Sequence, residues 1–158
     1  MEYYIMTSKR VTLFEHWLSD KIDHYNLYNL LLLQLGDLPI NPQNVRKILK
    51  KMNKTDLYEF VDFIVTELTT KPILHINKDL ETTLINMFIQ IDSVYLKHVP
   101  PDRKSFFNYN YVVYKLLQIL GHGEYLDMFP LYKSQELLDR SDVTFEKICF
   151  ELNWEIKI

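Results

Sequence analysis

The sequence predicts a mainly α protein, folded as a single compact multi-helix bundle with short loops over residues 1–158. Apolar side chains recur at spacings of three and four along most of the chain, which is the period of amphipathic helices, whereas the strict alternation of strands is scarce. Glycine and proline number only three and six, and they stand mostly between the periodic segments. A chain of this length is in the size range of one domain.

Two helical segments are predicted at the amino terminus. The first covers residues 11–23 and the second residues 25–35, where Gly36 and Pro39 end the apolar period. We expect both segments to bury one apolar face, because an amphipathic helix is stable mainly through the face that it packs.

The next two helices are predicted from their breakers and caps. One begins near Pro42, which is favoured in a first turn because the proline nitrogen has no proton to leave unbonded. Asn53 and Thr55 offer cap oxygens to a following helix, which ends before Pro72.

Three further regions of the carboxyl-terminal half read as helical. Asn77 or Asp79 begins a helix through residues 80–96, and two consecutive prolines then break the chain. Asp102 is the predicted cap of a helix over 103–121. Two short amphipathic helices follow at 134–140 and 143–152, and the tail at 153–158 is predicted to be a short strand or an extended end.

A polar stripe runs along the predicted helix at 103–121. On a helical wheel its members lie within about 40° of one line, and they include Lys104, Asn108, Tyr111 and Lys115. The stripe is either a solvated edge or a contact surface for phosphates or a partner's polar groups. Asn110 lies toward the buried half, where we expect its amide to hydrogen-bond to the backbone of a neighbouring helix or loop.

A basic face is predicted on the helix that begins near Pro42. Its cations fall opposite the apolar positions of the same helix and are Arg46, Lys47, Lys50, Lys51 and Lys54. Residues 1–54 hold eight Lys and Arg against five Asp and Glu, although the whole chain has a net charge of −3. The face is either a solvated surface or a contact for phosphates or for an acidic protein surface. The acidic helix that follows is a poor recognition helix for a major groove.

The sequence contains few residues in the patterns that are typical of catalytic or metal-binding sites. The five histidines are scattered without zinc-ligand spacing, and the single cysteine, Cys149, is predicted to be a buried small apolar residue. Glycine-rich phosphate loops are missing too. Trp154 is expected either to pack against the domain or to serve as an exposed docking anchor. No apolar run reaches the length of a membrane span, and we interpret the chain as intracellular.

Three stretches carry a resemblance to a known family. They are "KHVPPDRKSFFNYNYVVYKLLQILG", "EYLDMFPLYKS" and "FEKICFELNWEI", and weaker likenesses lie upstream in "FEHWLSDKID", "VRKILKKMN" and "YEFVDFIVTEL". Together they resemble the poxvirus late transcription factor 3-like family of poxviruses and related large DNA viruses. The likeness covers nearly the whole chain and is strongest from Lys97 to Ser134.

The resemblance implies a non-enzymatic factor for late viral genes. Its implied partners are the viral RNA polymerase, other late transcription factors and DNA, and its implied location is the viral factory in the host cytoplasm, with the virion left open. Longer members carry an amino-terminal cysteine cluster thought to bind zinc. This chain departs from that pattern, because Cys149 is its single cysteine, so we expect no cofactor here. Either it is a short member of the family or the cysteine module lies outside this sequence. If the chain acts in this way, the contact residues expected from the charge and helical pattern are the basic face together with Arg103, Lys104, Asn108, Tyr111 and Lys115. The alternative is a protein-interaction or assembly module of a viral complex that does not bind nucleic acid directly.

Overall fold

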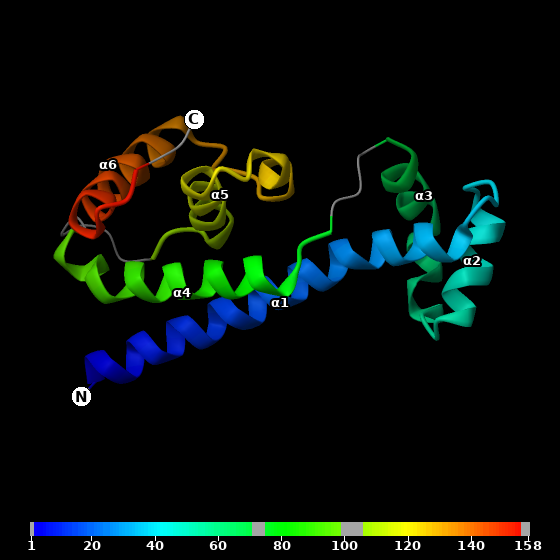
Figure 1. The fold of residues 1–158 in the computed structure, drawn as a ribbon, viewed down its shortest axis with the longest axis horizontal. Coiled ribbons are helices and arrows are strands. Elements are labelled where there is room, and N and C mark those ends of the chain that lie inside the picture. The colour runs from blue at the N-terminus through cyan, green and yellow to red at the C-terminus, as the bar shows by residue number, and fades with distance from the viewer. Residues whose placement is uncertain (1, 71–74, 99–105, 156–158) are drawn as a thin grey trace. The chain divides into compact units, whose positions relative to one another are not determined.

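The computed structural model describes residues 2–70, 75–98 and 106–155, and the side chains from residue 9 onward (Figure 1). The mainly α fold is confirmed, and no strand occurs in the described ranges, which include the first three residues of the predicted tail. The helices are α1 (Glu2–Leu35), α2 (Pro42–Lys51), the 3₁₀ helix η1 (Thr55–Phe60), α3 (Val61–Thr70), α4 (Lys78–Val94), the 3₁₀ helix η2 (Tyr95–Lys97), α5 (Tyr109–Leu120), the 3₁₀ helix η3 (Gly123–Met128) and α6 (Gln135–Leu152).

The chain divides into two compact units. Unit 1 comprises residues 1–17 and 78–158, and unit 2 comprises residues 18–77. Each has its own buried apolar side chains. The single domain over 1–158 stays a prediction.

Two pairs of predicted helices are in fact continuous. The segments at 11–23 and 25–35 are parts of α1, and those at 134–140 and 143–152 are parts of α6, so the predicted breaks are wrong. Neither junction contains glycine or proline, so nothing interrupts the backbone ladder there. Ser141, at the second junction, is fully buried within α6.

Helix α2 begins as the sequence predicts and ends differently. Asn41 is its N-cap, whose side-chain oxygen accepts the N–H of Asn44 at 2.8 Å, and Pro42 occupies the first turn. Asn53 adopts a left-handed conformation with φ 59° directly after this helix, so it terminates α2 and does not cap the next helix as predicted. Asparagine tolerates this conformation better than most residues. A 3₁₀ turn, η1, then leads into α3.

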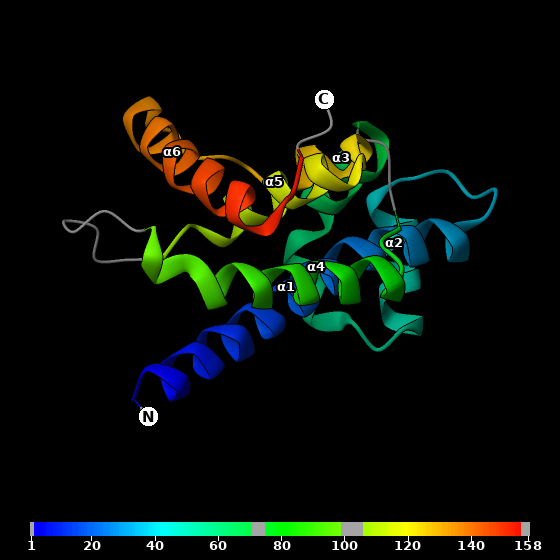
Figure 2. The ribbon, with the colours of Figure 1, turned by 60° about the vertical axis from the view of Figure 1, so that its left-hand side comes forward.

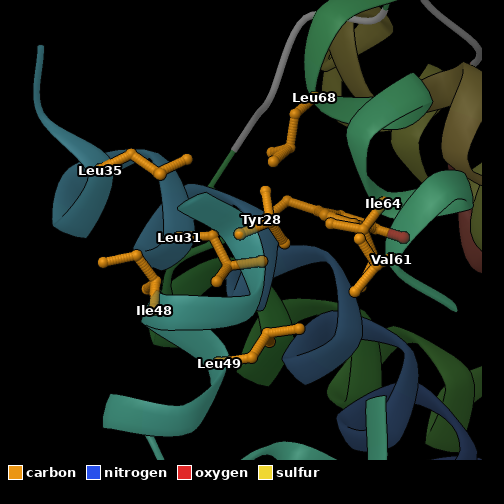
Figure 3. Packing of buried hydrophobic residues seen from close by; sticks show 9 residues of the cluster. Tyr28, Leu31, Leu35, Ile48, Leu49, Val61, Ile64 and Leu68 are labelled. Atoms are coloured by element: carbon orange, nitrogen blue, oxygen red, sulfur yellow. The ribbon is translucent and has the colours of Figure 1, made fainter. Parts of the chain in front are cut away.

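The hydrophobic core of unit 2 joins α1, α2 and α3. Figure 3 shows its side chains meeting between the three helices; the buried members are Tyr28, Leu31, Leu35, Val45, Ile48, Leu49, Val61, Ile64 and Leu68. The side chain of Asn26 closes the unit: its amide donates to the carbonyl of Ile76 and its oxygen accepts the Ile76 N–H, both at 3.2 Å. These two bonds attach the backbone at Ile76 to α1.

Unit 1 is built around aromatic rings. α4 runs beside the first part of α1 in both views (Figures 1 and 2). Phe14 of α1 stacks on Phe88 of α4 with ring centroids 3.9 Å apart, and Tyr109 at the start of α5 meets Phe14 edge-on at 5.5 Å. Trp17 also contacts Phe129, at 6.4 Å, in the segment before α6.

A buried ion pair crosses the same interface. Arg10 Nε lies 2.7 Å from Oδ1 of Asp92, whose side chain is fully buried, and the guanidinium also lies over the ring of Phe106 at 5.1 Å. Neither carboxylate oxygen has a well-aligned hydrogen bond within the described residues, in spite of the short distance. Burial accordingly raises the pKa of Asp92 above its usual 3.8, and Arg10 offsets this only partly.

Replacing Arg10 by methionine should lower the free energy of unfolding of unit 1 by about 3 to 5 kcal/mol, because Asp92 would keep a buried charge without its partner. The double variant Arg10→Met/Asp92→Leu should regain most of that loss, because it removes both charges. Hydrogen exchange of the α4 amides measures both effects. A double variant that is less stable than Arg10→Met would contradict this account.

Lys21 makes the free energy of unfolding of unit 2 depend on pH in the alkaline range. Burial lowers the pKa of its ammonium from 10.5 to about 8. Between these values the unfolded chain holds more protons than the folded one, so this group's contribution to stability rises with pH. Lys21→Met should be more stable than wild type at neutral pH, and the difference should shrink at about pH 10. Urea unfolding of both proteins at the two pH values tests this.

Candidate nucleic-acid or partner interface

The α2 basic face consists of Arg46, Lys47, Lys50, Lys51 and Lys54, and all five residues are exposed. The first four lie on α2, opposite Val45 and Leu49, which are fully buried in the core of unit 2. Lys50 and Lys51 occupy the last turn, where a cation is favoured by the negative end of the helix dipole. Burial of the apolar side therefore fixes the direction in which the cations point.

These cations are not engaged in ion pairs. Through residues 2–70, 75–98 and 106–155, no salt bridge involves any member of the α2 basic face. Asp56, Glu59 and Asp62 are exposed on η1 and α3, the elements that follow in the chain. The positive charge is thus available to a ligand. Whether the face binds one stays a prediction.

The second predicted surface begins later in the chain than expected. α5 starts at Tyr109, not near residue 103, because Asn108 caps it: the Asn108 side chain accepts the N–H of Asn110 at 2.8 Å. The N–H of Asn108 itself donates to the Tyr132 hydroxyl at 2.7 Å, which ties the cap to the segment before α6. Asp102, Arg103 and Lys104 lie outside the described residues.

Tyr111 is not part of an exposed stripe, so that prediction is wrong. Its side chain is fully buried, and its hydroxyl donates to Oδ1 of Asp142 in α6 at 2.6 Å. Burial, together with this carboxylate, raises the pKa of Tyr111 far above its usual 10.0. The wheel identified a polar side of α5 correctly but could not show that α6 covers it.

Lys115 is occupied by the same carboxylate. Its ammonium lies 3.1 Å from Oδ1 of Asp142, only 16% of its side chain is exposed, and it also lies 5.6 Å from the centre of the Tyr111 ring. A cation held in this way is poorly placed to meet phosphate. Asn108, Tyr111 and Lys115 are therefore parts of the fold, and Asp142 is the partner that sequence reasoning missed.

The two other predicted structural residues lie at the borders of helices. Asn110 is half-buried in the first turn of α5, and its predicted side-chain bond to a neighbouring helix or loop stays a prediction. Trp154 is half-buried too, and its backbone N–H donates to the backbone carbonyl of Cys149 at 2.9 Å, just after Asn153 ends α6 with φ 60°. The choice between packing and docking for Trp154 stays open.

The chemistry of the described residues offers no metal site. No group of three or more His, Cys, Asp or Glu side chains among them is arranged to hold a metal ion. Cys149 is buried as predicted, and burial raises the pKa of its thiol to about 11, which disfavours the reactive thiolate. The absence of a cofactor stays a prediction. No helix in the described ranges is long and apolar enough to cross a membrane.

The family described as "Poxvirus Late Transcription Factor VLTF3 like" matches residues 15–156, which is most of the chain. The chain belongs to this family. The resemblance seen in the sequence is therefore confirmed.

Two curated proteins of large DNA viruses are similar to this chain. "Putative transcription factor A494R" of Paramecium bursaria Chlorella virus 1 is 40% identical over 98 residues, which are 62% of this chain and 27% of that protein. "Putative transcription factor R429" of Acanthamoeba polyphaga mimivirus is 32% identical over 97 residues, which are 61% of this chain and 22% of that protein. The matched part is about a quarter of either relative. No solved structure matches significantly.

The residues that carried the family resemblance serve the architecture. In "NYNY", Asn108 caps α5, Tyr109 packs on Phe14 and Tyr111 binds Asp142. In "FPLYKS", Tyr132 accepts the Asn108 N–H, and the side chain of Ser134 caps α6. The motifs on which the family resemblance rests therefore contain residues that stabilise unit 1.

Removing the Tyr111 hydroxyl tests this structural assignment. Tyr111→Phe should destabilise unit 1 by about 1.5 to 3 kcal/mol, the usual worth of a hydrogen bond to a charged group. Thermal unfolding measures the loss, and DNA affinity measured on the folded variant should be unchanged. Tyr114→Phe, on the same helix but only half-buried, is the control and should have a smaller effect. A loss of DNA affinity without a loss of stability would contradict the assignment.

Proposed function

We propose that this chain is a helical domain of a viral late-gene transcription factor, which acts with the viral RNA polymerase and has no catalytic activity of its own. Family membership and the names of both curated relatives support a role in transcription. The finer proposal is that the α2 basic face contacts the phosphate backbone of DNA. The single observation that carries it is the set of five exposed cations that form no salt bridge with any other residue that the structure describes.

The geometry of the face favours phosphate contact over reading of bases. Lysine forms most of it, and lysine binds phosphate as a point charge. The face contains no Asn or Gln to read adenine, and Arg46 is its single planar cation. Phosphate contacts position a protein on DNA and carry no sequence information. The exposed acids of η1 and α3 would be repelled by a major groove, so neither helix reads bases in this proposal.

A second candidate function is an interaction module that meets only protein. The net charge of −3 favours it, because the chain as a whole is repelled by nucleic acid. In that case the α2 basic face contacts an acidic surface of the polymerase or of another late factor. The proposed place of action is the same for both candidates, the viral factory of the host cytoplasm, and neither uses zinc held by this chain.

Charge reversal tests the DNA contact. The variant Lys47→Glu/Lys50→Glu/Lys51→Glu should bind duplex DNA at least about tenfold more weakly than wild type, because three phosphate contacts become repulsive. For wild type, log K against log salt should have a slope of up to about −4.5, and for the variant a shallower one. Fluorescence anisotropy with a labelled duplex measures both.

The matched control is Lys9→Glu/Lys133→Glu/Lys147→Glu. It makes the same change in net charge at exposed lysines of unit 1, so it should weaken binding far less. No binding of wild type at low salt would contradict the DNA contact and favour the interaction module. Equal losses in both variants would show that net charge, and not this face, governs affinity.

The role in late transcription has its own test. Repressing the gene in the virus that encodes this chain should leave early transcripts at their normal level and lower late transcripts, as measured by sequencing RNA through infection. Supplying the wild-type protein should restore the late transcripts. An equal loss of early and late transcripts would contradict a late-gene factor.

A further inference from the structure

An apolar pocket lies on unit 2, apart from the cations of α2. Its volume is about 260 Å³, and it is lined by side chains of α1, η1 and α3. Tyr28 and Ile64, labelled in Figure 3, belong to the hydrophobic core and also line this pocket, together with Leu27 and Leu57. The pocket is thus a part of the core that stays open to the outside.

Two phenylalanines line the same pocket and remain exposed. Phe60 at the end of η1 is 49% exposed, and Phe63 in the first turn of α3 is 56% exposed. Large aromatic rings at the mouth of an apolar pocket are typical of surfaces that bind a partner. The volume is below the roughly 300 to 1,000 Å³ of most small-molecule sites. A single side chain of a partner is the better match.

The surroundings of the pocket are acidic. A second hollow shares His24 and Leu27 with it and is lined by Asp20 and Asp23. Asp56, Glu59 and Asp62 are exposed on η1 and α3, the elements that also supply Leu57, Phe60 and Phe63 to the pocket. Burial raises the pKa of Tyr28 to about 12, and the nearby charge of Glu67 adds to this increase. Lys54, a member of the α2 basic face, lines the second hollow, and no other Lys or Arg among the described residues lines either hollow.

We propose that this pocket is a docking site for a partner protein segment that inserts one aromatic or branched aliphatic side chain and carries Lys or Arg beside it. The apolar lining selects the inserted side chain, and the acidic rim selects the charge of its neighbours. The same rim repels phosphates, so nucleic acid is excluded as the occupant. Unit 2 then presents two surfaces of opposite charge preference.

A peptide selection tests the proposal without knowledge of the partner. A random peptide library displayed on phage is selected on the full chain, with counter-selection on Phe60→Ala/Phe63→Ala. Both rings are about half exposed, so this variant should fold, which circular dichroism checks. The enriched peptides should pair an aromatic or aliphatic residue with Lys or Arg. Peptides without that pairing, or no enrichment over the variant, would overturn the proposal.

Affinity measurements with one enriched peptide locate the contact. Fluorescence anisotropy should show about 30-fold weaker binding to Phe63→Ala, the change expected of an interface hot spot, and several-fold weaker binding to Asp20→Asn/Asp23→Asn. Phe150→Ala is the matched control, because Phe150 is 86% exposed on α6 of unit 1, and it should not change the affinity. An equal loss in the control would overturn the proposal.

Two further results separate this surface from its alternatives. The variant Lys47→Glu/Lys50→Glu/Lys51→Glu should bind the basic peptide as well as wild type does, even if DNA binding is lost, so the two proposals can fail independently. Sedimentation at rising concentration tests whether a second copy of this chain covers the pocket. A dimer that Phe63→Ala abolishes would overturn the proposal of a basic partner.

Discussion

The carboxylate of Asp142 holds α5 against α6, and the arrangement of unit 1 depends on it. One of its oxygens accepts the Tyr111 hydroxyl at 2.6 Å and lies 3.1 Å from the Lys115 ammonium. Both groups belong to the polar side of α5, which would otherwise be buried without partners at a cost of about 1 to 3 kcal/mol for each unsatisfied group. The Tyr111 ring in turn contacts Phe107, Tyr132 and Phe145, so the same hydrogen bond orients the aromatic packing around it.

Charge is used differently in unit 2. Its core consists of apolar side chains and is closed by the clamp between Asn26 and Ile76, so most of its charged residues lie on the outside, whereas Lys21 is half-buried. The cations gather on α2, while Asp20 and Asp23 line the hollow next to the pocket formed by α1, η1 and α3. Because α2 buries Val45, Ile48 and Leu49, its cations point away from the core. Each helix buries its apolar side in the core, so its charged residues lie on the opposite, exposed side.

The sequence predicted the helices better than it predicted their surfaces. Apolar spacing located every long helix, and the α2 basic face is exposed because its opposite side is strongly apolar. The stripe on α5 was misread because a helical wheel describes one helix alone. A tyrosine side chain can be either buried or exposed. Tyr111 is buried, and its hydroxyl is bonded to Asp142, which lies 31 residues away in the sequence. Continuity of α1 and α6 was missed because changes in apolar pattern were taken for helix ends where no glycine or proline breaks the chain.

The family signature and the proposed interfaces lie in different units, and this has a consequence for relatives. "NYNY" and "FPLYKS" supply caps, ring contacts and the bond to Asp142, all in unit 1, so selection for folding alone is enough to retain them. The α2 basic face and the exposed pocket rings of Phe60 and Phe63 belong to unit 2, and folding constrains such exposed residues less than buried ones. A relative that retains the signature therefore retains the architecture of unit 1, whereas its binding partners must be judged from the cations of α2 and from the acids and aromatic rings around the pocket.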